Sequence, residues 1–131
     1  MHYDHWREVR MVHADWPWKF FTPKEMADRS TGELQIDPAF LDRLDLLRSD
    51  FGRPLRILSA YRTPLHNAFV GGAPLSRHLT ANAADISIVE LEGGKTILRS
   101  LAFQAGFRGF GYYRTFLHID TGPAREWGKY K

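Results

Sequence analysis

The chain has 131 residues, 44% of them hydrophobic and 25% charged, and it contains no cysteine. This length predicts one domain with a hydrophobic core of its own. The missing cysteines exclude disulfide frameworks, thiol nucleophiles and cysteine-based zinc sites. The formal net charge of +3 is mildly basic. Such a charge suits an acidic polymeric partner, but without a block of like charges or a basic helix we expect no nucleic-acid binding.

The first residues and the apolar stretches of the sequence indicate where in the cell the protein is expected. No apolar stretch approaches the roughly 20 residues that a membrane-spanning helix needs. Charged residues lie in the segment 1–8, where a secretion signal would need an apolar core. We therefore expect synthesis in the cytoplasm without a secretion signal.

Residues 1–21 are rich in aromatic side chains and show no clear periodicity. Pro17 would break a helix that passed through it. We expect an irregular arm whose aromatic residues pack on a main domain of residues 22–131; an aromatic surface that contacts a ligand is the alternative. The aromatic residues of this arm are Tyr3, Trp6, Trp16, Trp18, Phe20 and Phe21.

Two helices are predicted before the first strand. The segment Thr-Pro-Lys-Glu at 22–25 has the cap, the first-turn proline and the acidic residue of a capping box, and Gly32 interrupts this helix. A longer helix begins at Asp37 and ends near Gly52, because apolar residues recur along it at spacings of three and four. These residues are Phe40, Leu41, Leu44, Leu47 and Phe51.

The second half of the chain alternates predicted strands with one helix. Branched apolar residues favour strands at 55–59 and 83–89. Residues 94–106 fit a helix that ends at a glycine, and 107–113 with 116–120 fit a hairpin. The order of these elements predicts an α+β fold, in which helices pack on a small antiparallel sheet.

Alternation along the predicted strands separates polar from apolar side chains. Asp85 and Ser87 share one face of their strand, opposite the apolar face. In the last strand, Phe116, His118 and Asp120 share a face. A glycine-rich loop at 70–76 leads into the first of these strands, and a short helical turn before it carries His66, which would either line a cleft or cap local structure.

Two histidines and one aspartate stand out as candidate metal ligands. The sequence has no nucleophile elbow, phosphate-binding loop or His-Glu-x-x-His helix. His78, Asp85 and His118 instead supply the three nitrogen and oxygen ligands that a catalytic zinc site typically uses, with a fourth position left for water. Spacing alone is not diagnostic, because the same residues also fit ordinary polar positions on a sheet face.

Several strings of residues strengthen the zinc interpretation. They are Ser-x-Tyr-Arg at 59–62, Ser-x-His-x-x-Ala-x-Ala-x-Asp at 76–85, Tyr-Tyr at 112–113, and Phe-x-His-Ile-Asp-Thr-Gly-Pro with a later Trp over 116–127. Together they resemble the zinc D-alanyl-D-alanine carboxypeptidase family, which includes peptidoglycan endopeptidases and phage endolysins. The match covers roughly residues 22–128 in order.

The resemblance implies a fold, a metal and a substrate. The fold would be similar to that of hedgehog-like domains, and one Zn²⁺ would be held by His78, Asp85 and His118. The substrate would be a stem peptide of the bacterial wall. Since no secretion signal is expected, the protein would reach the wall after release from the cell, for which phage-type lysis is one route. Arg62 would grip a substrate carboxylate, which suits the guanidinium fork.

Further residues of the matched strings are expected at the site. Ser59, Ser76 and Tyr112 would contact the substrate beside Arg62. Tyr113 and His66 are candidates for stabilising the oxyanion.

The sequence departs from the family pattern at the general base and at one turn. Thr115 and Phe116 stand where many members carry a proton acceptor before the last ligand. Asp120 is our candidate instead, roughly 7 Å along the strand from His118, either to activate the zinc water or to orient a ligand imidazole. Ala81 replaces a common glycine, next to Asn82 at an often basic position. A positive φ there would strain Ala81 by about 1 kcal/mol.

Two functions are consistent with these residues and with the family resemblance. The first is a zinc-dependent peptidase that hydrolyses amide bonds of D-amino acids in wall stem peptides or crosslinks, as a carboxypeptidase or an endopeptidase. The second is a zinc-containing module of the same fold that binds wall fragments or a protein without cleaving them.

Overall fold

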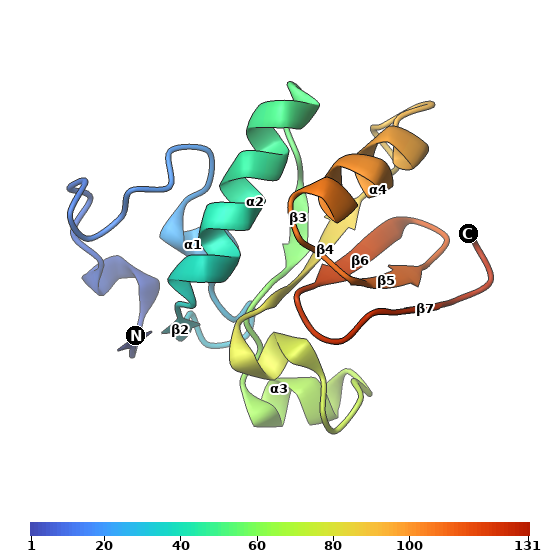
Figure 1. Cartoon of the computed structure of the whole chain (residues 1–131). Helices are drawn as coiled ribbons and strands as arrows, with labels where there is room; N and C mark the ends of the chain where they lie inside the picture. Colours follow the sequence, from blue (N-terminus) through green and yellow to red (C-terminus); the bar gives the residue numbers. More distant parts are fainter.

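A five-stranded sheet organises the fold in the computed structural model, which describes residues 1–131 (Figure 1). Its strand order is β3-β4-β6-β5-β7. The strands are β3 (Ile57–Ser59), β4 (Ala83–Ser87), β6 (Phe116–Asp120), β5 (Gly109–Tyr112) and β7 (Arg125–Trp127). All neighbouring strands are antiparallel except β5 and β7, which run parallel.

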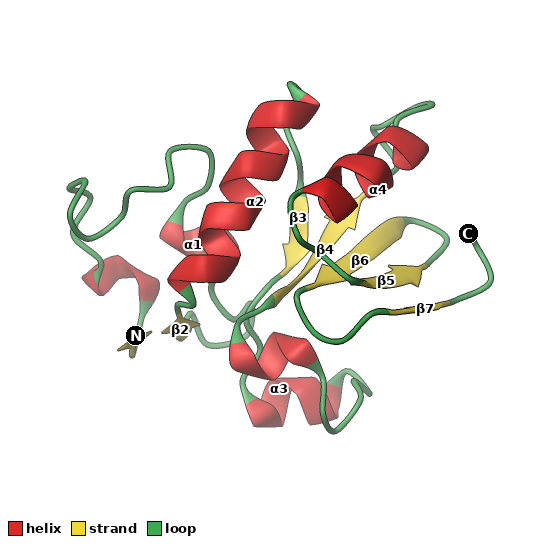
Figure 2. Cartoon of the chain, in the orientation of Figure 1, coloured by secondary structure: helices red, strands yellow, loops and turns green.

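The helices are distributed unevenly around this sheet (Figure 2). In Figure 1, α2 and α4 cover one face of the sheet, and α3 lies at the lower end of the view. The helices are α1 (Pro23–Met26), α2 (Pro38–Phe51), α3 (Pro64–Phe69) and α4 (Lys95–Gln104), with single 3-10 turns η1 (Trp6–Glu8) and η2 (Arg77–Thr80). This arrangement confirms the predicted α+β fold with a mostly antiparallel sheet.

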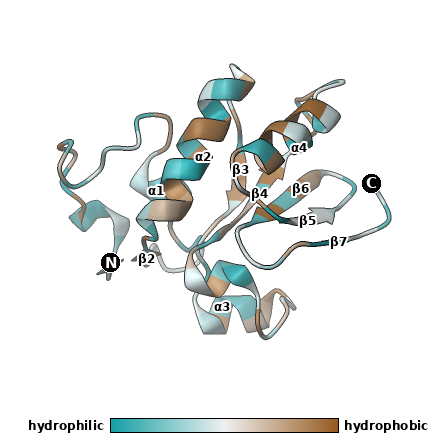
Figure 3. Cartoon of the chain, in the orientation of Figure 1, coloured by the Kyte–Doolittle hydropathy of each residue, from teal (hydrophilic) through white to brown (hydrophobic).

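The core lies between the sheet and the two long helices. Hydrophobic residues recur along α2, α4, β4 and β6 in Figure 3. Phe40 of α2 meets Phe107 edge-on, with ring centroids 5.7 Å apart, while Ile86 and Ile119 of the central strands are fully buried. The apolar face predicted for the long helix is therefore the face that packs on the sheet.

Helix ends follow the local sequence closely. The Thr22 side chain accepts from the amide of Glu25 and the Glu25 side chain accepts from that of Thr22, which confirms the predicted capping box. Asp37 caps α2, and Gly52 ends it in a left-handed conformation. The first helix is shorter than predicted, because Ala27 already adopts an extended backbone well before Gly32.

The N-terminal arm is mostly irregular, and its aromatic residues pack on the body as predicted. Trp16, Trp18 and Phe21 belong to the same buried cluster as Phe40. The Trp18 indole donates to Asp42 of α2 at 2.8 Å. The placement of a domain boundary at residue 22 stays a prediction.

Several short elements were not predicted from the sequence. β1 (His2–Tyr3) pairs with β2 (Leu34–Gln35) in a separate two-stranded sheet. No strand was predicted at β7, and η2 begins directly after the predicted loop at 70–76. Elements of two to four residues are too short to show a period. No helix of the structure is long and apolar enough to cross a membrane.

Candidate metal centre

Strands β4 and β6 and the turn before β4 bring three candidate ligands together. Asp85 on β4 lies directly opposite His118 on β6 in the antiparallel register. His78 lies on η2, which is fixed by the Ser76 hydroxyl accepting from the His78 amide at 3.2 Å. Residues far apart in the chain therefore converge because the strands are neighbours.

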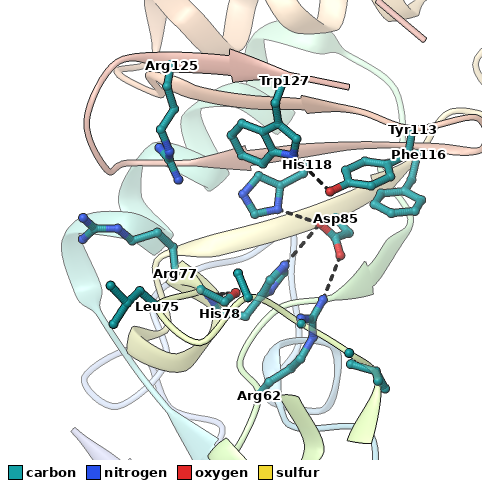
Figure 4. Close-up of a pocket in the computed structure, with 15 residues that line it drawn as sticks. Arg62, Leu75, Arg77, His78, Asp85, Tyr113, Phe116, His118, Arg125 and Trp127 are labelled. Atoms are coloured by element: carbon teal, nitrogen blue, oxygen red, sulfur yellow. Dashed lines mark hydrogen bonds and ion pairs between the residues drawn. The ribbon is translucent and has the colours of Figure 1, made fainter. Parts of the chain in front are cut away.

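The donor atoms of the three side chains converge on one point. Asp85 Oδ1 lies 3.2 Å from His78 Nε2 and 3.0 Å from His118 Nδ1 (Figure 4). The three ligand atoms all lie within 4.8 Å of one another. The residues are only 2%, 6% and 7% exposed for His78, Asp85 and His118. This buried set could hold one metal ion.

In each imidazole one ring nitrogen, the inner one, faces Asp85, and the other, the outer one, faces a second acceptor. His78 Nδ1 lies 2.5 Å from the carbonyl oxygen of Ala60, and His118 Nε2 lies 2.6 Å from Asp120 Oδ2. Because both partners are acceptors, a neutral ring carries its proton on the outer nitrogen, and the lone pair of the inner nitrogen is then available to a metal ion beside Asp85. The donor set therefore suits a divalent cation that prefers nitrogen and oxygen ligands.

Asp120 lies behind His118 and is fully buried. Its two oxygens accept from the Arg125 guanidinium at 2.9 and 2.8 Å, and Oδ1 also accepts from the Gly122 amide at 2.9 Å. Gly109 leaves space for this carboxylate, since a Cβ there would come within 2.1 Å of Oδ1. Asp120 thus faces the outer edge of the His118 ring, where it holds that ring's orientation.

For both Asp85 and His118, burial shifts the pKa in one direction and hydrogen bonds shift it in the other. Burial alone would raise the pKa of Asp85, but hydrogen bonds with His118 and His78 hold it well below its ordinary value. Burial would lower the pKa of His118, yet hydrogen bonds with Asp120 and Asp85 raise it. In the absence of metal the imidazolium of His118 is therefore more favoured than that of a free imidazole, and metal ion and proton compete for the nitrogen that faces Asp85.

Arg62 holds the second oxygen of Asp85. Its Nη2 lies 3.3 Å from Asp85 Oδ2, its Nη1 donates to Asn67 at 3.0 Å and its Nε donates to the Ser59 hydroxyl at 3.2 Å. These contacts fix the guanidinium at the edge of the candidate centre. Its remaining N–H groups are free for a substrate.

An open pocket of about 630 Å³ lies over the three ligands. Aromatic side chains of Tyr113 and Phe116 form one side, stacked at 4.4 Å. The Trp127 ring packs 5.0 Å from His118, and its indole donates to the Tyr113 hydroxyl at 3.0 Å. Because that hydroxyl already accepts a hydrogen bond, its own proton is available to a ligand in the pocket.

The expected substrate residues divide into those that line the pocket and those that do not. Arg62, Ser76 and Tyr113 line it. Tyr112 is buried in the core, where its hydroxyl contacts Glu126 and Arg99. Alternation along the chain sends neighbouring tyrosines to opposite faces of the sheet, so Tyr112 lacks the contact expected of it.

Ser59 and His66 also lie outside the pocket lining. The Ser59 hydroxyl is used by Arg62. His66 Nδ1 lies 2.9 Å from the carboxylate of the fully buried Asp28. No contact links His66 to the candidate centre, and its role with an oxyanion stays a prediction without geometric support.

Two arginines line the pocket that were not predicted from the sequence to lie at the site. Arg77 and Arg125 both line it. Arg125 lies inside a string that resembles the family, but nothing in its spacing marks it as a partner of Asp120. Its strand, β7, is placed by parallel pairing with β5.

The turn that carries His78 ends at Ala81, for which strain was expected if its φ were positive. Ala81 adopts φ 60° and ψ 28°, and it is the only residue other than glycine with a positive φ. The turn does place a positive φ at Ala81, the condition under which the sequence analysis expects strain there. A glycine there would relieve this strain.

The sheet of this α+β domain carries a buried His-Asp-His set that could hold a metal ion beneath an open pocket. Metallohydrolases use sites of this kind. The model of the peptidase M15 family matches residues 19–120. The chain belongs to the peptidase M15 family, which confirms the resemblance seen in its sequence.

Curated relatives carry names that refer to the bacterial wall. The peptidoglycan L,D-endopeptidase MepK of Escherichia coli (strain K12) is 36% identical over 101 residues, which cover 70% of this chain and 54% of the relative. The same values hold for MepK of Shigella flexneri. The probable peptidoglycan L,D-endopeptidase MepK of Haemophilus influenzae is 28% identical over 113 residues, covering 78% of this chain and 60% of the relative. The chain thus spans little more than half the length of these relatives.

Proposed function

We propose that this chain is a zinc-dependent peptidoglycan endopeptidase, which hydrolyses amide bonds between L and D centres in wall stem peptides or crosslinks. The observation that carries the proposal is the pair of imidazoles with their outer nitrogens occupied by acceptors. Their inner nitrogens converge with Asp85 under an open pocket. Family membership and the names of the relatives support the reaction and the substrate.

His78, Asp85 and His118 would hold a single zinc ion. Zinc in such a site supplies Lewis acidity, which lowers the pKa of a coordinated water and polarises the scissile carbonyl. The chain's own part is to orient both imidazoles and to bind the ring proton at the outer nitrogen, so that the inner nitrogen faces the ion. Ala60 does this for His78 through its carbonyl, and Asp120 does it for His118 through its carboxylate.

The pocket side chains would position the substrate and its developing charge. Tyr113 can donate its hydroxyl proton to the oxyanion, because the Trp127 indole already donates to that oxygen. Arg62, held by Asp85 and Asn67, can bind a substrate carboxylate with its remaining donors. We assign Asp120 the orienting role among its two predicted roles, since Arg125 and His118 already occupy its oxygens.

A second candidate function is a metal-containing module that binds wall peptides without cleaving them. One observation favours it: Asp85 is the only carboxylate among the residues that line the pocket. Thr115 and Phe116 occupy the positions where many family members carry a proton acceptor. A binding module would need the same ligands but no proton acceptor.

A digest of purified peptidoglycan separates the two functions. The zinc-loaded protein, the chelated protein and His118→Ala are incubated with the wall, and soluble fragments are identified by mass spectrometry. Fragments with new termini from the zinc-loaded protein alone would support the peptidase and identify its bond. His13→Ala, which changes an exposed histidine of the N-terminal arm, is the matched control and should cleave like the wild type. A folded, zinc-loaded protein that releases nothing from several wall types would refute the peptidase.

A further inference from the structure

The pocket is chemically divided on its two sides. In Figure 4, Arg77 and Arg125 lie on one side of the His78 and His118 rings, and the aromatic pair Tyr113 and Phe116 lies on the other. The three candidate ligands lie between these sides. A peptide that crosses the centre therefore meets cationic groups on one side and flat apolar groups on the other.

The two arginines differ in their partners. Arg125 is paired with Asp120 through both terminal nitrogens. Arg77 lines the same pocket, but no carboxylate of the chain forms an ion pair with its guanidinium. Arg77 is thus a cation without a counter-charge next to the candidate centre.

The position of Arg77 is built into the fold. Its backbone forms the first residue of η2, directly before His78. Its guanidinium lies against Gly122, where a Cβ would come within 2.8 Å of Arg77 Nε. The missing side chain at Gly122 therefore provides the space that this guanidinium occupies.

The charge balance of the lining favours an anionic ligand. Three arginines line the pocket; Asp85 pairs with Arg62, and Asp120, which lies behind His118, pairs with Arg125, so the charge of Arg77 is left unbalanced. A divalent cation on the ligands would add further positive charge. Partly buried charges are screened less than exposed ones, so this imbalance acts strongly on a bound ligand.

We propose that Arg77 is a specificity-determining residue, which binds a free carboxylate of the substrate next to the scissile amide. The proposal rests on the proposed function of the same site. A guanidinium fork binds a carboxylate through two parallel hydrogen bonds. The substrate class is then a wall peptide with an unmodified carboxylate beside the cleaved bond, and a peptide with that group converted to an amide is disfavoured.

The test compares two substrates and three proteins. Each zinc-loaded protein is given synthetic crosslinked stem peptides, identical except that the carboxylate next to the cleaved bond is free or a primary amide. The proteins are the wild type, Arg77→Gln and Arg114→Gln, and kcat and KM are measured separately. Arg114 lies exposed in the β5–β6 turn, outside the pocket lining, so its variant matches the change in net charge.

The wild type and Arg114→Gln should prefer the free carboxylate by roughly tenfold or more in kcat/KM, the size of one charge-assisted hydrogen bond. Arg77→Gln should lose most of this preference through a higher KM for the acid, with the amide little affected. Arg77→Lys should recover only part of it, because an ammonium lacks the fork.

The outcomes distinguish the two proposals. If the wild type cleaves neither peptide nor whole wall, the proposed function fails. If it cleaves both peptides equally well, or if Arg77→Gln keeps the full preference for the acid, the proposed function stands and the role of Arg77 is overturned. An equal loss on both peptides would also overturn it, since that result means general damage to the site.

Discussion

Two buried clusters in this protein combine an aspartate with histidine, and only one of them is suited to hold a metal. Asp85 faces His78 and His118 beneath the pocket, whereas Asp28 faces His66 between the start of α3 and the segment after α1. Both aspartates are almost inaccessible to solvent. Their difference lies in what the oxygens contact.

Asp28 is saturated by donors of the chain itself. Ser30 donates its amide and hydroxyl, Thr31 donates its amide and hydroxyl, and Thr63 donates its amide, at distances between 2.5 and 3.3 Å. Asp85 instead faces two imidazole nitrogens, and the acceptors behind both rings let the neutral rings direct their lone pairs to a metal ion. Proximity of Asp and His therefore does not define a metal site; convergent lone pairs beside an open pocket do.

The largest expected effect comes from removing one imidazole of each cluster. His118→Ala should lose bound zinc and activity altogether, by more than the roughly 10–100-fold that loss of an outer hydrogen-bond partner causes. His66→Ala should keep a full equivalent of zinc, because its partner is Asp28. Metal content after dialysis, measured by mass spectrometry, checks both. Equal zinc loss in the two variants would end the distinction between the clusters.

Asp120→Asn separates the orienting role from the general-base role. As an outer partner of His118, it should weaken zinc affinity by roughly 10–100-fold. Turnover should largely return at saturating zinc, since the proposed role is to hold the ring. Zinc affinity is measured by competition with a chromophoric chelator, and turnover by fragment release. Activity that stays absent from a fully loaded variant would show instead that Asp120 accepts a proton.

Asp28→Asn should affect stability and leave zinc affinity unchanged. It replaces a buried carboxylate that accepts several hydrogen bonds, and losing one hydrogen bond to a charged group costs about 1.5–3 kcal/mol. Burial would raise the pKa of Asp28, but hydrogen bonds with Ser30, Thr63 and His66 hold it well below the ordinary value. Its stabilisation is therefore complete above the unfolded-state pKa of about 3.9 and is lost as the pH falls below it.

Urea unfolding of the metal-free proteins at several pH values checks this prediction. The gap in unfolding free energy between wild type and Asp28→Asn should be widest near neutral pH and should narrow below about pH 3.9. A gap that stays constant into acid would mean that Asp28 contributes through packing alone.

The smallest effect concerns the turn that presents His78. Ala81→Gly should stabilise the protein by about 0.5–1 kcal/mol, because glycine adopts the positive φ of this residue without strain. Ala39→Gly in the first turn of α2 is the matched control and should destabilise by about 1 kcal/mol. Midpoints of urea unfolding measure both. A destabilised Ala81→Gly would show that the buried methyl group outweighs the strain.

Strong local signals made much of the fold predictable. Capping residues and periodic apolar positions located α2, and the alternation around Asp85 and His118 located β4 and β6 with their polar faces. The family strings then identified the three residues that the structure brings together. The metal they hold and the roles of the surrounding side chains remain predictions.

The missed features depend on neighbours far away in the chain. β7 has three residues, and it becomes a strand only because β5 offers a free edge. The same pairing carries Arg125 to Asp120, which no spacing in the sequence predicts. Tyr112 and Tyr113 were both expected at the site, but a strand can turn only one of two successive side chains to each face.

The two imidazoles of the candidate centre are supported by different kinds of partner. His78 is held by the carbonyl of Ala60, a main-chain group that every amino acid at position 60 would supply. His118 is held by the side chain of Asp120, which a single codon change can alter. The affinity of this centre is therefore adjustable from one side only. Variation at position 120 would tune how firmly a bound ion is kept, while the support of the other imidazole would stay constant.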